Sequence, residues 1–242
     1  MRIGQIQIGK DGRSLGLSNN QLKIIAMIAM TVDHAGQIIF PDEKWMRMIG
    51  RLAFPIFAYM IAEGCRYTRH RWRYLLHLAA FALGCQVVYS IITRSLYMSI
   101  FATFSLSILL IYSVDHFLNK KDILSLFALL FVSFGTILLT CVLPSLLAEY
   151  DFDLDYGLYG VMFPVVVYYL PAGVARLFGV AFMLSVKCYI SGSLSLYGFF
   201  SLPLLLMYNG KRGKYKLKYL FYVFYPTHLA LLYILQIFLI GS

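Results

Sequence analysis

Long runs of apolar residues, separated by short polar segments, fill most of this chain of 242 residues. A bilayer core is crossed by a helix of roughly 17–25 residues, and most of these runs have that length. The pattern predicts nine spans, at residues 21–40, 47–64, 74–93, 96–114, 123–147, 157–171, 172–190, 193–208 and 219–241. Because Pro164, Pro171 and Pro203 interrupt the short sixth to eighth runs, eight or ten spans also stay open. We therefore expect an all-α, polytopic integral membrane helical bundle.

The ends of the pattern indicate how the chain is organised. Residues 1–20 are polar and lack an apolar segment followed by a cleavage site, so no removable signal peptide is expected. We predict a polar cytoplasmic N-terminal segment at 1–20 and a single transmembrane domain at 21–242. The four cysteines are far apart and form no CxxC pair, which favours buried, inert thiols.

Composition excludes a soluble globular enzyme. Hydrophobic residues make up 60% of the chain and charged residues only 13%, against a charged share of about 25% in an average soluble domain. A net charge of +10 could indicate nucleic-acid binding, but the charges lie between apolar runs rather than on one basic face. The predicted partner is the lipid bilayer, and no nucleic-acid partner is expected.

The basic residues favour a cytoplasmic N-terminus, because Lys and Arg accumulate in the inner loops of membrane proteins. With this orientation, inner segments hold 16 of the 21 Lys and Arg residues, outer loops hold four, and Arg51 lies within a span. The inner residues are Arg2, Lys10, Arg13, Lys23, Arg66, Arg69, Arg71, Arg73, Lys120, Lys121, Arg176, Lys211, Arg212, Lys214, Lys216 and Lys218; the outer ones are Lys44, Arg47, Arg94 and Lys187. The predicted location is the inner, cytoplasmic membrane.

Four polar side chains from three predicted spans fall at similar depth in the membrane. Asp33 and His34 lie roughly 15 Å beyond Lys23 at the helical rise of 1.5 Å per residue, and His228 lies roughly 14 Å into the last span. Arg51 enters from the outer side to a depth of roughly 9 Å. Ionisable groups within a span are costly and indicate a functional site by default.

These residues fit acid–base chemistry, although structural readings stay open. A histidine assisted by an aspartate can take a proton from a hydroxyl or amine nucleophile. Adjacent helical residues point about 100° apart, so Asp33 can pair with Arg51 while His34 faces a cavity. A buried ion pair or a hydrogen-bonded histidine could instead serve packing alone. Glu63 is either a further catalytic residue or a partner of Arg66, one turn later.

Two basic clusters, at 66–73 and 211–218, lie on the predicted inner side. Positive-inside statistics can explain both, but Arg and Lys are also the usual partners of phosphate groups. In YNGKRG, at 208–213, two glycines flank Lys211 and Arg212 and would let backbone amides approach phosphate oxygens. No GxSxG, HExxH, Walker or GxGxxG motif is present.

The acidic stretch at 149–157 resembles the opening of a calcium-binding loop. Asp151, Asp153 and Asp155 have the spacing of the first EF-hand ligands, but Tyr156 stands at the glycine position and Met162 at that of the bidentate glutamate. We therefore expect no metal site and interpret this stretch as an outer loop that can contact an acceptor.

Several segments together resemble the TraX family, which takes its name from the F-pilin acetylation protein. These are LKIIAMIAMTVDHAG (22–36), IGRLAFPIFAYMIAEGCRYTRHRWRYLL (49–76), DYGLYGVM (155–162), YNGKRG (208–213) and KYLFYVFYPTHLALLYIL (218–235). The family is similar to transmembrane acyltransferases, which transfer an acetyl group from cytoplasmic acetyl-CoA to an acceptor at or beyond the membrane. The resemblance carries functional residues to Asp33 and His34, Arg51, Glu63 with Arg66, and Tyr225 with His228, while residues 95–150 match far less clearly.

The resemblance implies a membrane-bound acyl-CoA-dependent acetyltransferase with acetyl-CoA as the acyl donor and no metal. His34, assisted by Asp33, would be the general base, and Arg51, Tyr225 or His228 would donate hydrogen bonds to the developing oxyanion. Lys211, Arg212, Arg66 and Arg69 would bind the CoA phosphates. The acceptor, a peptide N-terminus or a glycan hydroxyl, and a homo-oligomeric state stay open.

Two other functions stay open. A transporter or proton-coupled carrier would use intramembrane Asp, His and Arg equally well. A non-catalytic envelope or conjugation assembly protein would need the polar groups only to fix helix packing.

Overall fold

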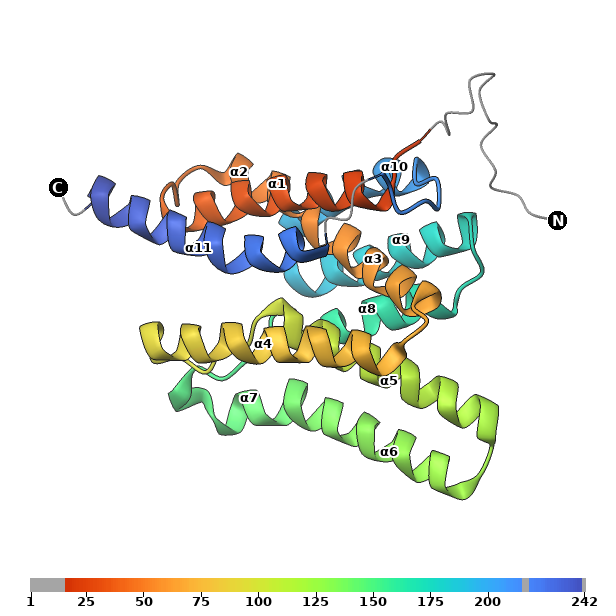
Figure 1. The fold of residues 1–242 in the computed structure, drawn as a ribbon. Coiled ribbons are helices and arrows are strands. Elements are labelled where there is room, and N and C mark those ends of the chain that lie inside the picture. Colours follow the sequence, from red (N-terminus) through yellow and green to blue (C-terminus); the bar gives the residue numbers. More distant parts are fainter. Residues whose placement is uncertain (1–15, 215–217, 241–242) are drawn as a thin grey trace, which may run out of the picture. The chain divides into compact units, whose positions relative to one another are not determined.

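The structure, a computed structural model, describes residues 16–214 and 218–240 (Figure 1). Within these ranges the chain is helical and forms no strand, apart from isolated bridges at Leu17–Tyr208 and Met98–Leu154. This confirms the predicted all-α class. Most of the predicted N-terminal segment, with Arg2, Lys10 and Arg13, lies outside the described residues, as does Lys216.

The chain forms two compact units. The first comprises residues 1–60 and 170–242, and the second comprises residues 61–169. Helix α3, Ala53–Tyr67, begins in the first unit and ends in the second. The single transmembrane domain expected at 21–242 stays a prediction.

The first unit is built around helix α1. Helix α1 spans Asn19–Ile38. The other elements of this unit are α2 (Lys44–Gly50), the start of α3, α9 (Val174–Ser191), a 3₁₀ segment (Ser193–Phe200), α10 (Ser201–Leu206) and α11 (Lys218–Ile240). Helices α1 and α11 pack side by side and run in the same direction (Figure 1). A shared direction is what the predicted topology requires of the first and ninth spans.

The start of α1 is held by its own cap and by a distant loop. The Ser18 hydroxyl accepts a hydrogen bond from the Gln21 backbone N–H at 3.4 Å, and the Gln21 side chain accepts one from the Ser18 N–H at 2.8 Å. The next free N–H groups, of Asn19 and Asn20, donate to the carbonyls of Lys211 and Arg212 at 2.9 and 3.2 Å. The loop at 208–213 therefore supplies acceptors that the first turn of a helix otherwise lacks.

Helix α2 packs closely on α1 because glycines stand at the contact. A Cβ atom built on Gly36 would lie 2.7 Å from the Cβ of Met46, and one built on Gly50 would overlap the side chain of Asp33. The absence of a Cβ atom at these two glycines thus allows the short distance between α1, which carries Asp33, and α2.

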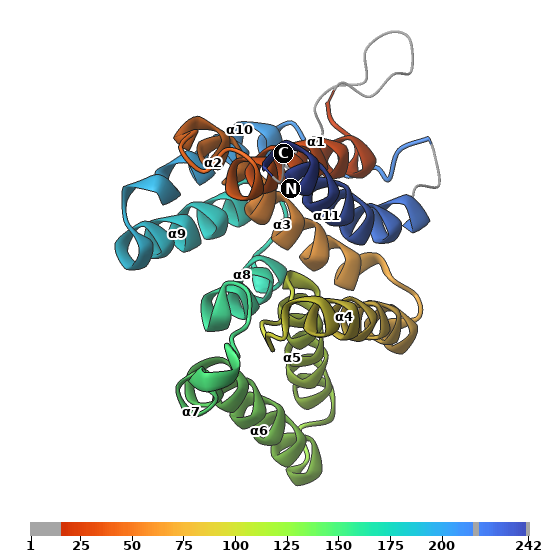
Figure 2. The same ribbon diagram turned by 90° about the vertical axis from the view of Figure 1, so that its left-hand side faces the viewer.

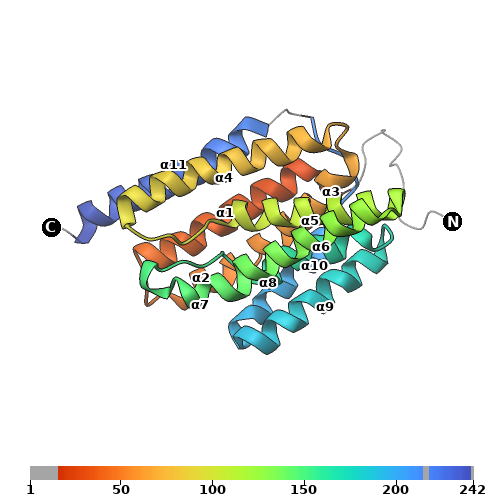
Figure 3. The same ribbon diagram turned by 90° about the horizontal axis from the view of Figure 1, so that it is seen from below.

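In the second unit, helix α5 occupies the centre. It packs against α4, α6 and α8 (Figure 2 and Figure 3). The helices are α4 (Arg71–Thr93), α5 (Ile100–Lys120), α6 (Ile123–Ile137), α7 (Leu143–Leu146) and α8 (Gly157–Tyr169). Ile108 and Ile111 of α5 are fully buried, as are Val161, Phe163 and Val167 of α8. This contact forms the apolar core of the unit.

The long run predicted at 123–147 is one helical stretch with a local widening. A π-helical turn, Leu138–Val142, joins α6 to α7, which has Pro144 in its first turn. Because proline lacks an N–H and its ring clashes with the carbonyl four residues earlier, the α-helical bonding pattern cannot continue through Thr140 unchanged. The widened turn accommodates this.

Much of the apolar surface faces outward. In the part of the chain that the structure describes, five helical stretches are long and apolar enough to cross a membrane: Lys44–Tyr67, Arg71–Ile91, Ile100–Lys120, Ile123–Leu146 and Val174–Ser191. Only 11% of the most apolar part of Ile123–Leu146 is buried within the protein. A water-soluble monomer rarely exposes apolar surface of that extent, so the chain is a membrane protein. The number of crossings and the side of the N-terminus stay predictions.

Candidate functional site

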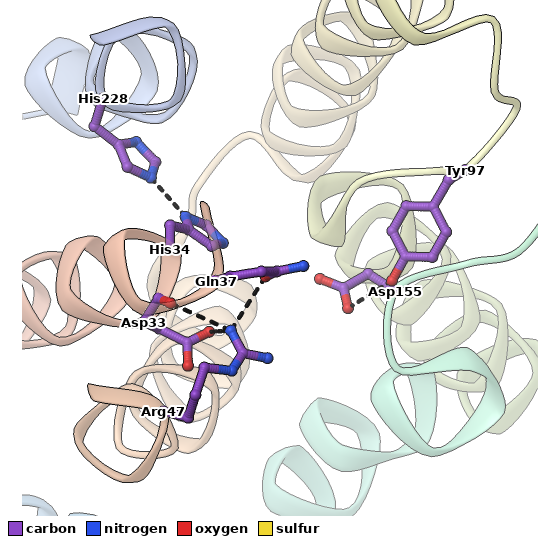
Figure 4. Close-up of polar contacts among 7 residues, drawn as sticks. All are labelled: Asp33, His34, Gln37, Arg47, Tyr97, Asp155 and His228. Carbon is purple, nitrogen blue, oxygen red and sulfur yellow. Dashed lines mark hydrogen bonds and ion pairs between the residues drawn. The ribbon is translucent and has the colours of Figure 1, made fainter. Parts of the chain in front are cut away.

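A hydrogen-bonded pair of histidines joins α1 to α11 in the first unit. Nδ1 of His34 lies 2.8 Å from Nε2 of His228, and the two rings stack with their centroids 5.1 Å apart (Figure 4). His228 is only 6% exposed. Phe224 stacks on the His228 ring at 4.7 Å, and Tyr225 meets it edge-on at 5.6 Å. His228 is therefore packed among aromatic groups of its own helix.

The partners of His228 decide which nitrogen atoms carry protons. Nδ1 of His228 lies 2.9 Å from the carbonyl oxygen of Phe224, which can only accept, so Nδ1 is the donor. Nε2 of a neutral His228 then accepts from Nδ1–H of His34. Nε2 of His34 is consequently unprotonated, and within the described part of the chain no group bonds to it. The arrangement leaves one imidazole lone pair ready to take a proton.

Asp33 faces α2 rather than the histidines. Its Oδ2 atom forms an ion pair of 2.9 Å with Nη1 of Arg47, which also donates to the Asp33 carbonyl at 3.3 Å and to Oε1 of Gln37 at 3.1 Å (Figure 4). The side chains of Arg47 and Asp33 are 27% and 18% exposed. Because neighbouring helical residues point about 100° apart, His34 faces α11 while Asp33 faces α2. The side chain that orients His34 is therefore His228, whereas the family resemblance gives this role to Asp33.

The structure pairs Asp33 with Arg47 rather than with Arg51. Arg51 follows the last turn of α2, and its Nε atom is buried without a hydrogen-bond partner among the described residues. Sequence reasoning assigned Arg47 to an outer loop and missed it. Its position one helical turn before Arg51 was the available signal, since residues four apart share a helix face.

The other residues with an expected catalytic role are divided between the units. Tyr225 lies in the first unit, with its ring centroid 6.4 Å from that of His34. Glu63 is 3% exposed and lies on the part of α3 that belongs to the second unit. Glu63 is therefore not placed relative to the histidine pair.

Lys211 and Arg212 expose their side chains, but their backbone is already engaged. The N–H of Lys211 donates to Oδ1 of Asn209 at 2.9 Å, and the carbonyls of both residues accept from the start of α1. Gly210 and Gly213 adopt φ angles of +71° and +98°, which favour glycine, and so give the loop this turn. The amide of Lys211 is thus unavailable to a phosphate, whereas the two side chains are exposed.

The second basic cluster belongs to a polar network of the second unit. Arg71 forms an ion pair of 2.8 Å with Asp115, which also accepts from the hydroxyls of Tyr168 and Tyr169 at 2.7 and 3.0 Å. Arg66 donates to the carbonyl of Tyr168 and lies over its ring. Arg69, by contrast, is exposed and takes no part in these contacts. Part of the cluster therefore fastens α3, α4, α5 and α8 together.

The acidic stretch after α7 is tied to the segment before α5. The Ser95 hydroxyl donates to Asp151 at 2.7 Å, the Tyr97 hydroxyl donates to Asp155 at 3.2 Å, and the Thr103 hydroxyl donates to the Asp155 carbonyl at 2.7 Å. Among the described residues, no group of three or more acidic, histidine or cysteine side chains is arranged to hold a metal ion. The aspartates of this loop serve as hydrogen-bond acceptors within the unit.

Comparison with known proteins identifies the family. The model of the TraX protein family matches residues 18–236. The chain belongs to the TraX family. This TraX family chain is 29% identical over 254 residues to a protein of Dichelobacter nodosus named "Probable fimbrial assembly protein FimC, serogroup H1", a match that covers 94% of this chain and 99% of that protein. It is 41% identical over 49 residues to Protein TraX of Escherichia coli (strain K12), which covers 20% of this chain and 19% of that protein. No solved structure matches the chain significantly.

Proposed function

We propose that this TraX family protein is a membrane-bound acetyltransferase. It moves an acetyl group from cytoplasmic acetyl-CoA to an amine or hydroxyl acceptor, such as a peptide N-terminus or a glycan, at or across the membrane. One observation carries the proposal: the His34–His228 hydrogen bond, fixed by the Phe224 carbonyl, leaves Nε2 of His34 as an unprotonated base. Packing alone would not require a base held in one tautomer inside a membrane protein.

The chemistry follows from this tautomer. Nε2 of His34 takes the proton of the acceptor while the acceptor nitrogen or oxygen bonds to the thioester carbon. The carbonyl electron pair moves onto oxygen, and it returns as the carbon–sulfur bond breaks. The departing CoA thiolate then takes the proton back from His34. During this cycle His228 stays neutral, accepts from Nδ1–H throughout and stabilises the imidazolium.

The donor is bound in this proposal by the exposed side chains of Lys211 and Arg212. Their loop is held against the first turn of α1, the helix that carries His34, so phosphate binding and base lie at the two ends of one helix. Arg66 and Arg69, which the family resemblance also assigns to the CoA phosphates, belong to the second unit, and their part in donor binding stays a prediction.

The name of the Dichelobacter relative favours a second candidate. A protein named for probable fimbrial assembly supports a part in assembling surface fibres, in which the polar pairs would only fix helix packing. The two candidates differ in one respect, because only the acetyltransferase binds and consumes an acyl-CoA.

Ligand-dependent stability tests the proposal in the purified full chain. A ligand that binds the folded state at 100 times its Kd stabilises it by about 2.7 kcal/mol, so acetyl-CoA should raise the unfolding temperature. The double variant Lys211→Ala/Arg212→Ala should lose most of this increase. The matched control Lys44→Ala/Lys120→Ala, which removes two other exposed cations, should keep it. If acetyl-CoA causes no stabilisation of the wild-type chain at millimolar concentration, the proposed donor is wrong.

A further inference from the structure

The amide group of Gln37 is held with its donor end free. Its Oε1 atom accepts from Nη1 of Arg47 at 3.1 Å, so its Nε2 atom points the other way (Figure 4). The Gln37 side chain is exposed, and no group among the described residues accepts from its amide N–H groups. The hydrogen bond from Arg47 thus fixes the orientation of the Gln37 amide, although this side chain lies on the helix surface.

Arg47 presents a second free donor beside it. All three hydrogen bonds of its guanidinium come from Nη1, and those to Asp33 hold the planar group in place. Nη2 donates to no group of the described residues. Because a guanidinium offers five N–H donors in a rigid fork, fixing one nitrogen also fixes the direction of the others.

The free donors of Gln37 and Arg47 lie on the same side of the site as Nε2 of His34, the proposed base. Gln37 follows His34 by three residues on α1, so their side chains share a helix face, with Cβ atoms about 5–6 Å apart. Figure 4 shows the free nitrogen of His34, the amide nitrogen of Gln37 and the free nitrogen of Arg47 on one side of the pair of helices. A small group approaching the base therefore meets both donors.

We infer that the amide of Gln37 and Nη2 of Arg47 form the oxyanion site of the reaction and bind the acyl carbonyl oxygen. This inference rests on the proposed function and replaces Arg51, Tyr225 and His228, to which the family resemblance gave this role. Acyl transfer moves a full negative charge onto the carbonyl oxygen, and donors already fixed in direction stabilise that charge without reorganising. Neither Gln37 nor Arg47 was expected from the sequence to act on the substrate.

The charge of the site agrees with this use. Asp33 offsets the charge of Arg47 in the resting state, so the cluster is close to neutral before the substrate arrives. A carboxylate substrate would bring its charge on binding, whereas an acyl carbonyl acquires charge only in the transition state. The cluster thus supplies its strongest interaction when the negative charge forms on the carbonyl oxygen.

The kinetics of Gln37 variants test the inference. The full-length protein would be purified in lipid nanodiscs, and kcat and KM for acetyl-CoA would be measured for wild type, Gln37→Ala and Gln37→Glu. Loss of one oxyanion donor lowers kcat by about 10²-fold or more, and KM should change little. Gln37→Glu should fall further, because a carboxylate repels the oxyanion. Gln86→Ala, which removes an amide bonded to Ser90 on α4, should keep the wild-type kcat.

An infrared measurement gives an independent result that a purely structural role would not produce. The C=O stretch of bound acetyl-CoA labelled with carbon-13 at the carbonyl should move to lower frequency in wild type and return towards the free value in Gln37→Ala. Arg47→Lys, which keeps the charge opposite Asp33 but loses the fork, should also lose part of the shift.

The outcomes separate this inference from the proposed function. If wild type neither binds nor consumes acetyl-CoA, the proposed function fails. If wild type is active and both Gln37 variants keep a kcat within about tenfold of it, well short of the loss expected for an oxyanion donor, only the oxyanion assignment is overturned. An unshifted carbonyl band in the active wild type would overturn it as well.

Discussion

Replacing Gly50 with alanine should separate Asp33 from Arg47 without removing either charge. Gly50 is the last residue of α2 and is buried against α1. A Cβ atom at this position would overlap the Cβ, Cγ and Oδ1 atoms of Asp33. These atoms cannot rotate away easily, because Oδ2 of the same carboxylate is held by Arg47 at 2.9 Å.

The size of the effect follows from the overlap. A Cβ atom on Gly50 would lie 2.1–2.3 Å from these Asp33 atoms, whereas carbon atoms in contact are separated by about 3.5–4.0 Å. Helices α1 and α2 must therefore move apart by about 1–2 Å, or the carboxylate must leave its site. Overpacking of this kind costs about 1–3 kcal/mol. Elsewhere, alanine in place of a helical glycine gains about 0.5–1 kcal/mol. Gly84 on α4 and Gly135 on α6 have no atom within 4 Å of a built Cβ and provide that reference.

The assay is equilibrium unfolding of the purified protein in mixed micelles, with helicity as the signal. Gly50→Ala should lie about 1–3 kcal/mol below Gly84→Ala in free energy of unfolding, because both variants gain helix propensity and only Gly50→Ala is overpacked. Its Arg47–Asp33 ion pair should be lost. A Gly50→Ala protein as stable as Gly84→Ala would refute the close packing of α1 and α2 at Asp33.

Three further predictions concern the same groups and one helix cap. His228→Gln should keep more kcat than His228→Ala, because the glutamine Oε1 can still accept Nδ1–H of His34; equal losses would argue against a positioning role. Arg47→Met should lower the free energy of unfolding by about 1–3 kcal/mol, because it leaves the partly buried Asp33 charge unpaired. Adding Asp33→Asn to this variant should restore at least half of the lost free energy. Strictly additive losses in this double-mutant cycle would show that the pair is not coupled. Hydrogen bonds from Ser125 hold the pKa of Asp122 below its usual range. The stability that this carboxylate contributes should therefore be present above a pH of about 4 and be lost as the pH falls further. The difference in unfolding temperature between wild type and Asp122→Asn should accordingly shrink at low pH; a difference that stays constant would contradict this.

The positions of the helices could be predicted because the membrane constrains them. An apolar run must be helical to satisfy its backbone in lipid, and helices occupy all nine predicted intervals within the described residues. The break between α2 and α3 could not be predicted, since the run at 47–64 is continuous in hydropathy. The chain turns at Arg51 and Leu52, which places Pro55 in the first turn of α3, where its missing N–H is not needed.

The residues of the site could be found from depth, but their partners could not. Depth alone brought His34 and His228 together as candidates, and the structure joins them at 2.8 Å. Asp33, in contrast, had two arginines within reach, Arg47 and Arg51, one helical turn apart. Which one faces α1 depends on how α2 rotates about its axis, and Gly50 decides this through packing rather than through charge.

The central claim is that His34 is the base of an acetyl transfer, and the consumption of acetyl-CoA by the purified chain tests it most directly. Thiol release from acetyl-CoA would be measured for wild type, His34→Ala and His116→Ala, the last being an exposed histidine on α5. The account predicts release by wild type and His116→Ala and a loss of about 10²-fold or more in His34→Ala. A His34→Ala protein that releases thiol at the wild-type rate would contradict it.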